Sequence, residues 1–138
     1  MRHVYVAGPY TAPTPEGVVR NVEVAIDAAN RLLDAGLWPY VPHLSHYLHA
    51  RKARDYEAWL GLDLAVLGRM DALLRLPGES RGADREVFHM TEVLARPVFT
   101  CEYDLYAWAH DGCITASECR ARLRELGEAF TSRVVGPR

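Results

Sequence analysis

The chain has 138 residues, of which 49% are hydrophobic and 25% are charged, so it can build one globular domain with its own core. It carries 16 basic and 18 acidic side chains, giving a net charge of −2, and no long basic run, which argues against a polymeric nucleic acid as ligand. No segment approaches the roughly 18 apolar residues of a membrane span, so we expect no membrane partner. The three cysteines, Cys101, Cys113 and Cys119, lack a paired spacing, and we expect a reduced, cytoplasmic protein.

Alternation of apolar and polar stretches predicts the elements in chain order. A strand is expected from His3 to Ala7, ending at Gly8-Pro9, and a helix from Gly17 to Ala35, ending at Gly36. The elements that follow are a strand at 37–41, a His-rich segment at 43–49, a helix at 55–69, a strand at 71–76, a helix at 83–95 and a strand at 97–100. Beyond Tyr103 we expect an irregular aromatic stretch and then a helix from Thr115 to Phe130.

This order predicts an α/β fold. Strands that alternate with helices form a small doubly wound, Rossmann-like or flavodoxin-like, mostly parallel sheet of four to five strands, with helices on both faces and a C-terminal helix. We expect a single domain over residues 1–138, with an α/β core at 1–100 and a C-terminal extension at 101–138. If the first strand lies between the second and third, the loops Gly8–Tyr10 and Pro77–Gly82 meet where ligands bind in such folds.

Asp63 is the first candidate site residue. It falls on the apolar face of the predicted helix at 55–69, together with Tyr56, Trp59 and Leu60. A charged, unpaired carboxylate among core residues costs several kcal/mol, so we expect a raised pKa or a dedicated partner. Asp63 is then either a general acid or ligand-binding group, or a buried residue that holds a loop backbone.

The turn Ser80-Arg81-Gly82 is the second candidate. It leads from a strand into a helix, where free backbone N–H groups, the Ser80 hydroxyl and the Arg81 charge favour an anion. Glu86 lies about one turn into that helix and can face the same crevice. The alternative is ordinary helix-start chemistry, in which Ser80 or Asp84 caps the helix and Glu86 complements its dipole.

The end of the first strand is the third candidate. Ala7 and Gly8 bring a slender backbone to the crevice, and alternation places Tyr5 and Ala7 on the same face of the sheet. Tyr5 is either a core aromatic residue whose hydroxyl finds a partner, or a phenol that orients a nucleophile.

Taken together, these pieces resemble the nucleoside 2-deoxyribosyltransferase-like superfamily of nucleoside deoxyribosyltransferases and nucleoside 5'-monophosphate N-glycosidases. The resemblance is carried by Tyr5-Val6-Ala7-Gly8-Pro9, by Asp63 followed by Met70-Asp71-Ala72-Leu73-Leu74, and by Ser80-x-Gly82-x-x-x-Glu86. It covers Val4 to Phe99 in order, and the turn from Leu76 is closest to uncharacterised bacterial and phage members.

The resemblance implies cleavage or exchange of the base–sugar bond of a (deoxy)nucleoside or its 5'-monophosphate. Glu86 would be the nucleophile that forms a glycosyl ester, Tyr5 would hold its carboxylate, and Asp63 would protonate the leaving base. The resemblance also implies a homo-oligomer, a dimer or a tetramer, and no metal or other cofactor. We expect the substrate to contact Gly8, Pro9, Tyr10, His43, Ser80, Arg81 and Gly82.

Two features favour other interpretations. His43, His46 and His49 have a spacing that converges poorly for a metal site, and no cysteine completes the set, so we expect them to line the crevice or an interface. Phe88 follows Glu86 where relatives carry small residues, which points to a narrowed or re-aimed pocket. It favours the alternative function, a non-catalytic nucleotide-binding or sensing module of the same fold.

Overall fold

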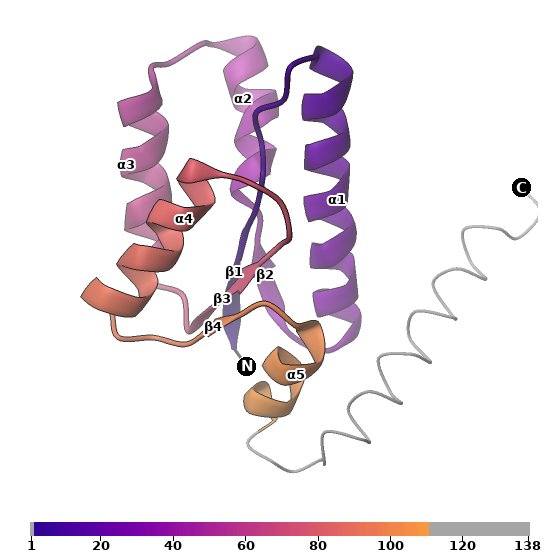
Figure 1. Cartoon of the computed structure of the whole chain (residues 1–138), viewed down its shortest axis with the longest axis vertical. Coiled ribbons are helices and arrows are strands. Elements are labelled where there is room, and N and C mark those ends of the chain that lie inside the picture. The colour runs from indigo at the N-terminus through magenta and orange to yellow at the C-terminus, as the bar shows by residue number, and fades with distance from the viewer. Residues whose placement is uncertain (1, 111–138) are drawn as a thin grey trace, which may run out of the picture.

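The computed structural model describes residues 2–110 and shows an α/β fold built on a four-stranded, all-parallel sheet (Figure 1). Strand β1 (His3–Ala7) lies between β2 (Trp38–Tyr40) and β3 (Ala72–Arg75), and β4 (Val98–Phe99) is the outer strand beside β3. The order is therefore β2-β1-β3-β4. The predicted doubly wound architecture, with the first strand inside the sheet, is confirmed.

Helical segments occupy the connections between the strands and follow the last strand. Within residues 2–110, no helix combines the length and the apolar composition that crossing a membrane requires. In chain order they are α1 (Pro15–Asp34), the 3-10 turn η1 (Pro42–Leu44), α2 (Ser45–Arg51), α3 (Tyr56–Leu67), α4 (Arg81–Phe88), the π-helical turn η2 (His89–Val93) and α5 (Glu102–Ala109).

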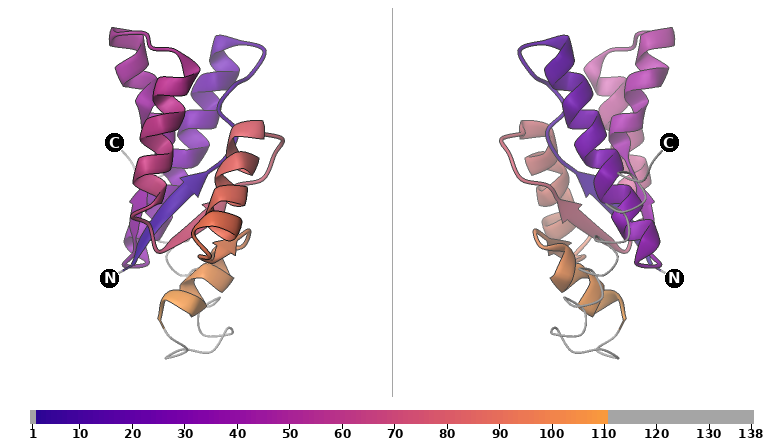
Figure 2. Two further views of the ribbon diagram at one scale, coloured as in Figure 1. Left: turned by 90° about the vertical axis from the view of Figure 1, so that its left-hand side faces the viewer. Right: turned by 90° about the vertical axis from the view of Figure 1, so that its right-hand side faces the viewer.

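The sheet separates two layers of helices (Figure 2). Val4 and Val6 of β1 point to the face that α1 and α5 cover, whereas Tyr5 and Ala7 point to the face that α3 and α4 cover. This follows from the two-residue period of a strand. The predicted common face of Tyr5 and Ala7 is confirmed, and it is the face from which the candidate site is built.

Helix α1 begins and ends at the signals that the sequence carries. The Thr14 hydroxyl accepts a hydrogen bond from the Gly17 N–H at 3.1 Å, and Pro15 occupies the first helical position. Gly36 follows with φ of 79°, a left-handed conformation that glycine adopts without a steric penalty.

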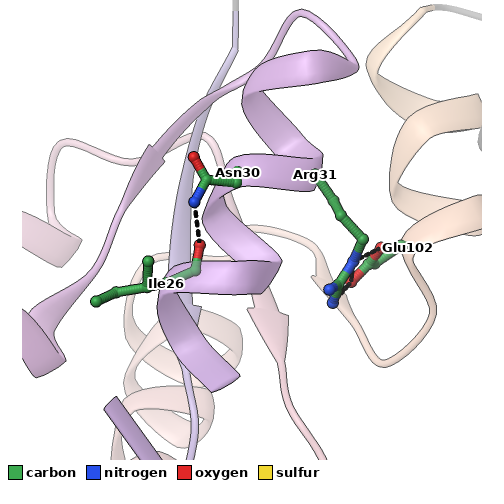
Figure 3. A network of polar contacts seen from close by, with 4 residues as sticks. All are labelled: Ile26, Asn30, Arg31 and Glu102. Atoms are coloured by element: carbon green, nitrogen blue, oxygen red, sulfur yellow. Dashed lines mark hydrogen bonds and ion pairs between the residues drawn. The ribbon is translucent and has the colours of Figure 1, made fainter. Parts of the chain in front are cut away.

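Helix α5 corrects the expectation of an irregular aromatic stretch around Tyr103. Leu105 and Tyr106 are buried, and an ion pair fixes the start of the helix: Arg31 of α1 approaches Glu102 with Nη2 2.7 Å from Oε1 (Figure 3). Packing against α1 and β4 thus stabilises a segment whose local pattern is weak. The predicted helix Thr115–Phe130 lies outside the described residues, as do Cys113 and Cys119.

Helix α4 is shorter than the predicted helix at 83–95. It ends at Phe88 and continues as the π-helical turn η2. The Thr91 hydroxyl donates to the carbonyl oxygens of Val87 and Phe88, at 3.0 and 3.2 Å. A hydroxyl that bonds back in this way competes with the backbone ladder, which accounts for the change in helix type.

Candidate active site

The two loops that the topology predicts to be neighbours are in direct contact at the carboxyl ends of β1 and β3. The Leu76 N–H donates to the Ala7 carbonyl at 2.7 Å. Glycines permit this approach: a Cβ on Gly8 would lie 2.9 Å from the Leu76 Cβ, and one on Gly78 would lie 2.8 Å from the Pro9 Cγ. Gly78 also has φ of 111°, so both loops depend on the absence of a side chain.

A cavity of about 750 Å³ opens above these loops. One wall is the start of α4, the opposite wall is η1 with α2, and α3 forms the third. Of the predicted site residues, the cavity is lined by Gly8, Tyr10, His43, Asp63, Ser80, Arg81, Gly82 and Glu86. Pro9 and Tyr5 are outside this lining: Pro9 packs against Gly78, and Tyr5 is fully buried in the sheet.

Tyr5 and Glu86 form a buried pair that joins the sheet to α4. The Tyr5 hydroxyl donates to Glu86 Oε1 at 2.8 Å, and Glu86 is only 8% exposed. Burial raises the pKa of Tyr5, so the phenol keeps its proton and acts as a donor. Burial and the bond to Tyr5 give Glu86 a role besides complementing the helix dipole, which was its role in the alternative interpretation. The phenol holds a carboxylate at the edge of the cavity.

The Glu86 carboxyl group is a weaker acid than an ordinary glutamate side chain. Burial raises its pKa to about 7, and the negative charge of Asp63 acts in the same direction. The hydrogen bond from Tyr5 and the positive charge of Arg75 both lower it. Glu86 therefore titrates near neutral pH, in the range where a carboxyl group can act both as a nucleophile and as a proton carrier.

Asp63 faces the same cavity from α3. Burial raises its pKa to about 6, which agrees with the expectation of a perturbed carboxyl group. Its Oδ1 is enclosed and has no hydrogen-bond partner within the described part of the chain, so this oxygen holds no loop backbone there. The expected core environment is wrong, however: Tyr56 on the same face is 54% exposed and Trp59 is half-buried, because this face lines the cavity.

The Ser80 turn caps helix α4 and also lines the cavity. The Ser80 hydroxyl accepts a hydrogen bond from the Ala83 N–H at 3.1 Å, so the capping interpretation is confirmed for Ser80. Asp84 instead pairs with Arg75, at 3.0 Å. Ser80 and Arg81 nevertheless line the cavity at the N-terminus of α4, where the helix dipole favours negative charge.

Arg85 connects the two helical walls. Its Nη1 donates to the Tyr56 hydroxyl at 3.1 Å, and its guanidinium lies over the Tyr56 ring at 5.9 Å. Both side chains line the cavity, so α3 and α4 are in contact across its rim. The sequence analysis did not identify either residue as part of the site.

His43 lines the cavity as a neutral ring. Its Nε2 lies 2.9 Å from the Pro9 carbonyl oxygen and must donate to it, since a carbonyl only accepts. Burial lowers the pKa of His43, so the neutral ring carries its proton on Nε2. Nδ1 is buried and has no hydrogen-bond partner among residues 2–110.

The other two histidines have separate partners. His46 Nδ1 lies 2.9 Å from the Tyr10 hydroxyl, and His49 Nδ1 accepts the Trp59 indole N–H at 2.9 Å. Within the part of the chain that the structure describes, no group of three or more His, Cys, Asp or Glu side chains is placed to hold a metal ion. The expected position along the crevice holds for His43 and His49, which line the cavity.

Phe88 corrects the expectation of a narrowed pocket. Its side chain is 64% exposed and does not line the cavity. Successive residues of a helix are about 100° apart, so a residue two positions after Glu86 points away from the side that Glu86 faces. The feature that favoured a non-catalytic module is thus directed at solvent.

Three further residues near the site could not be assigned to it from the sequence. The helical spacing predicts Trp59 as a core residue of an amphipathic helix, whereas its side chain lines the cavity. Tyr40 stacks near Tyr5, with ring centroids 5.6 Å apart, and burial raises its pKa. Arg75 lies within the predicted strand at 71–76, and no signal in the sequence marks it as part of the site.

The comparisons do not assign the chain to a family. No protein-family model matches the sequence, and no curated protein matches it. The architecture stands as a small α/β fold with a four-stranded parallel sheet of the Rossmann-like type.

Proposed function

We propose that this protein cleaves or exchanges the N-glycosidic bond of a (deoxy)nucleoside or its 5'-monophosphate, through a covalent ester between the sugar and Glu86. One observation carries the proposal: a tyrosine-bonded glutamate and a second carboxyl group of raised pKa, Asp63, face one cavity at the carboxyl ends of parallel strands. The resemblance of the sequence motifs to the nucleoside 2-deoxyribosyltransferase-like superfamily supports the same reaction.

The cavity walls suggest how such a ligand lies. The N-terminus of α4, with Ser80 and Arg81, suits a 5'-phosphate. The opposite wall from η1, α2 and α3 is rich in rings, including His43 and Trp59, and suits a planar base. Because β1 lies between the strands that lead to these walls, the sugar would then lie over the centre of the site, beside Glu86.

The first step transfers the sugar to the protein. Breaking the bond between C1' and the base nitrogen builds positive charge on the sugar and negative charge on the base. Tyr5 occupies Oε1 of Glu86, so Oε2 attacks C1' and forms the ester. The electron pair of the broken bond leaves with the base, and the Asp63 proton goes to the base nitrogen.

The second step releases the sugar. Water or a second base attacks C1', the ester bond breaks, and Glu86 departs as a carboxylate. The proton of the incoming nucleophile passes to Asp63, which returns the site to its starting state. Two successive displacements retain the configuration at C1'. Water gives hydrolysis, and a second base gives exchange.

The reaction needs Glu86 ionised and Asp63 protonated at the start. Their pKa values of about 7 and about 6 are so close that the pair titrates as a unit and holds about one proton near neutral pH. These pKa values already include the effects of Tyr5 and Arg75, so in the ligand-free protein the proton lies mainly on Glu86. The active form, with Glu86 ionised and Asp63 protonated, is the minor form, and Tyr5 and Arg75 raise its population because both stabilise an ionised Glu86.

The decisive experiment incubates the protein with a panel of ribo- and deoxyribonucleosides and their 5'-monophosphates and measures free base by chromatography. We expect release by the wild type and by Glu57→Gln, an exposed matched control on α3, and none by Glu86→Gln. Adding a second base separates exchange from hydrolysis. Release that survives Glu86→Gln contradicts the mechanism. Binding without release by the wild type would instead support the nucleotide-sensing module.

The proposal includes a homo-oligomer, a dimer or a tetramer, as the resemblance implies. Large apolar side chains remain exposed on two helices, among them Tyr47 and Leu48 of α2 and Tyr56 of α3. Exposed large apolar residues are typical of interaction surfaces where they form a contiguous patch. Light scattering gives the molecular mass, and a monomeric mass at all concentrations would contradict this part of the proposal.

A further inference from the structure

Arg75 occupies an unusual place for a charged residue. It is the last residue of β3, opposite Ala7 in the neighbouring strand β1, and its side chain is only 14% exposed. The residues before it in β3 are apolar and buried. A guanidinium in such a position is costly unless partners satisfy it.

Its partners belong to the turn that faces the proposed phosphate. Nη1 donates to the Leu76 carbonyl, and Nη2 donates to the Gly78 carbonyl at 2.9 Å and to Asp84 Oδ1 at 3.0 Å. Asp84 lies in the first turn of α4. One guanidinium therefore joins the end of β3, the turn and the start of α4. Arg75 is not among the residues that line the cavity, so it supports the turn and does not contact a ligand.

The same guanidinium acts on Glu86 through its charge. It lowers the pKa of Glu86, in the same direction as the Tyr5 hydrogen bond. The raised pKa of Asp63 comes from burial. Arg75 thus favours the state in which Glu86 is ionised and Asp63 holds the proton.

Resting on the proposed N-glycosidic reaction, we propose that Arg75 is the positioning residue of this site: its planar fork fixes the turn that lines the cavity, and with it the start of the helix that carries Glu86. This role and the effect of the charge on Glu86 have different requirements. Fixing the turn needs several donors in one plane, which only arginine offers, whereas the effect on Glu86 needs only a positive charge.

Three variants separate these effects in the pH profile of kcat/KM for base release. Arg75→Met removes the charge, so the acid limb moves to higher pH by about one unit. Arg75→Lys keeps the charge, so the limb stays in place, but the preference for a 5'-monophosphate over the matching nucleoside falls about tenfold or more. Asp84→Asn leaves the Arg75 charge uncompensated, and the limb moves slightly to lower pH.

A measurement without substrate makes this test independent of the proposed reaction. Carbon-13 NMR of labelled glutamate follows the Glu86 carboxyl, which is assigned by its absence in Glu86→Gln. If no nucleotide is turned over but Arg75→Met raises the titration midpoint and Arg75→Lys does not, the proposed function fails and the electrostatic role of Arg75 stands. If the midpoint is the same in all variants, or activity falls at every pH only in proportion to the folded fraction, the inference is overturned.

Discussion

The bond between Tyr5 and Glu86 gives the sharpest test of the chemistry, and Tyr5→Phe removes the donor without changing the ring. A hydrogen bond to a charged group is worth about 1.5–3 kcal/mol, which corresponds to roughly one to two pKa units. Without this bond, the pKa of Glu86 should rise from about 7 to roughly 8–9. At pH 7 the ionised fraction then falls from about a half to roughly 1–10%, so base release slows about 5- to 50-fold.

The assay is the pH profile of kcat/KM for base release. We expect the acid limb of Tyr5→Phe to move to higher pH and the rate to recover toward the wild-type level above about pH 9. Tyr103→Phe on α5, outside the cavity lining, is the matched control and should leave the profile in place. A uniform loss of rate with an unmoved limb, or no loss at pH 7, would refute the assigned role of the phenol.

Three other substitutions test the site and the loops beneath it. The pKa of Glu86 is raised above its unfolded value of 4.5, so ionisation of Glu86 destabilises the wild-type fold as pH rises. In urea unfolding, the stability of Glu86→Gln relative to the wild type should therefore increase by about 3 kcal/mol between about pH 4.5 and pH 8. A difference that stays constant with pH would contradict the raised pKa. Asp63→Asn should slow release of an ordinary base on the order of a hundredfold or more, but it should not slow release from a nucleotide whose base is already cationic and needs no proton. An equal loss of rate on both substrates would exclude the role of Asp63 as an acid. Gly78→Ala, with φ of 111° and a Cβ 2.8 Å from Pro9 Cγ, should cost about 1–3 kcal/mol of stability, whereas Gly61→Ala in the open middle of α3 should stabilise by up to about 1 kcal/mol; matching effects would show that the loop contact is not tight.

The parts of the fold that sequence could predict are those that depend on local periodicity and on general topology. The run from His3 to Ala7 reads as a buried strand, and Gly36 marks the end of a helix, because these signals act within a few residues. The meeting of Gly78 with Pro9 also follows, since parallel strands deliver their loops to one edge. Helix α5 depends on Arg31, seventy-one residues away from its partner, and no local pattern records such a contact.

Some residues of the candidate site could likewise be predicted from local sequence, and others could not. Asp63 could be identified because it interrupts an apolar helix face, where a carboxyl group is costly, and Glu86 because it lies about one turn into the helix that follows the Ser80 turn. Arg75 could not, because no sequence motif encodes the two backbone carbonyls and the Asp84 carboxylate that its guanidinium contacts. The expectation that Phe88 narrows the pocket rests on its being two residues from Glu86 in the sequence. A helix places such a residue on nearly the opposite side, and Phe88 is exposed.

Helix α3, which carries Asp63, is anchored to the core less firmly than Glu86 is. Leu67 is its one fully buried residue, whereas Glu86 is fastened through Tyr5 to the centre of the sheet. Substitutions along α3 can therefore reshape this wall of the cavity at little cost in stability, while changes around Tyr5 disturb the core. Under the proposed function, the wall that meets the leaving base can therefore vary while the group that attacks the sugar stays fixed, and a mutant library confined to the cavity side of α3 is the natural route to altered base selectivity.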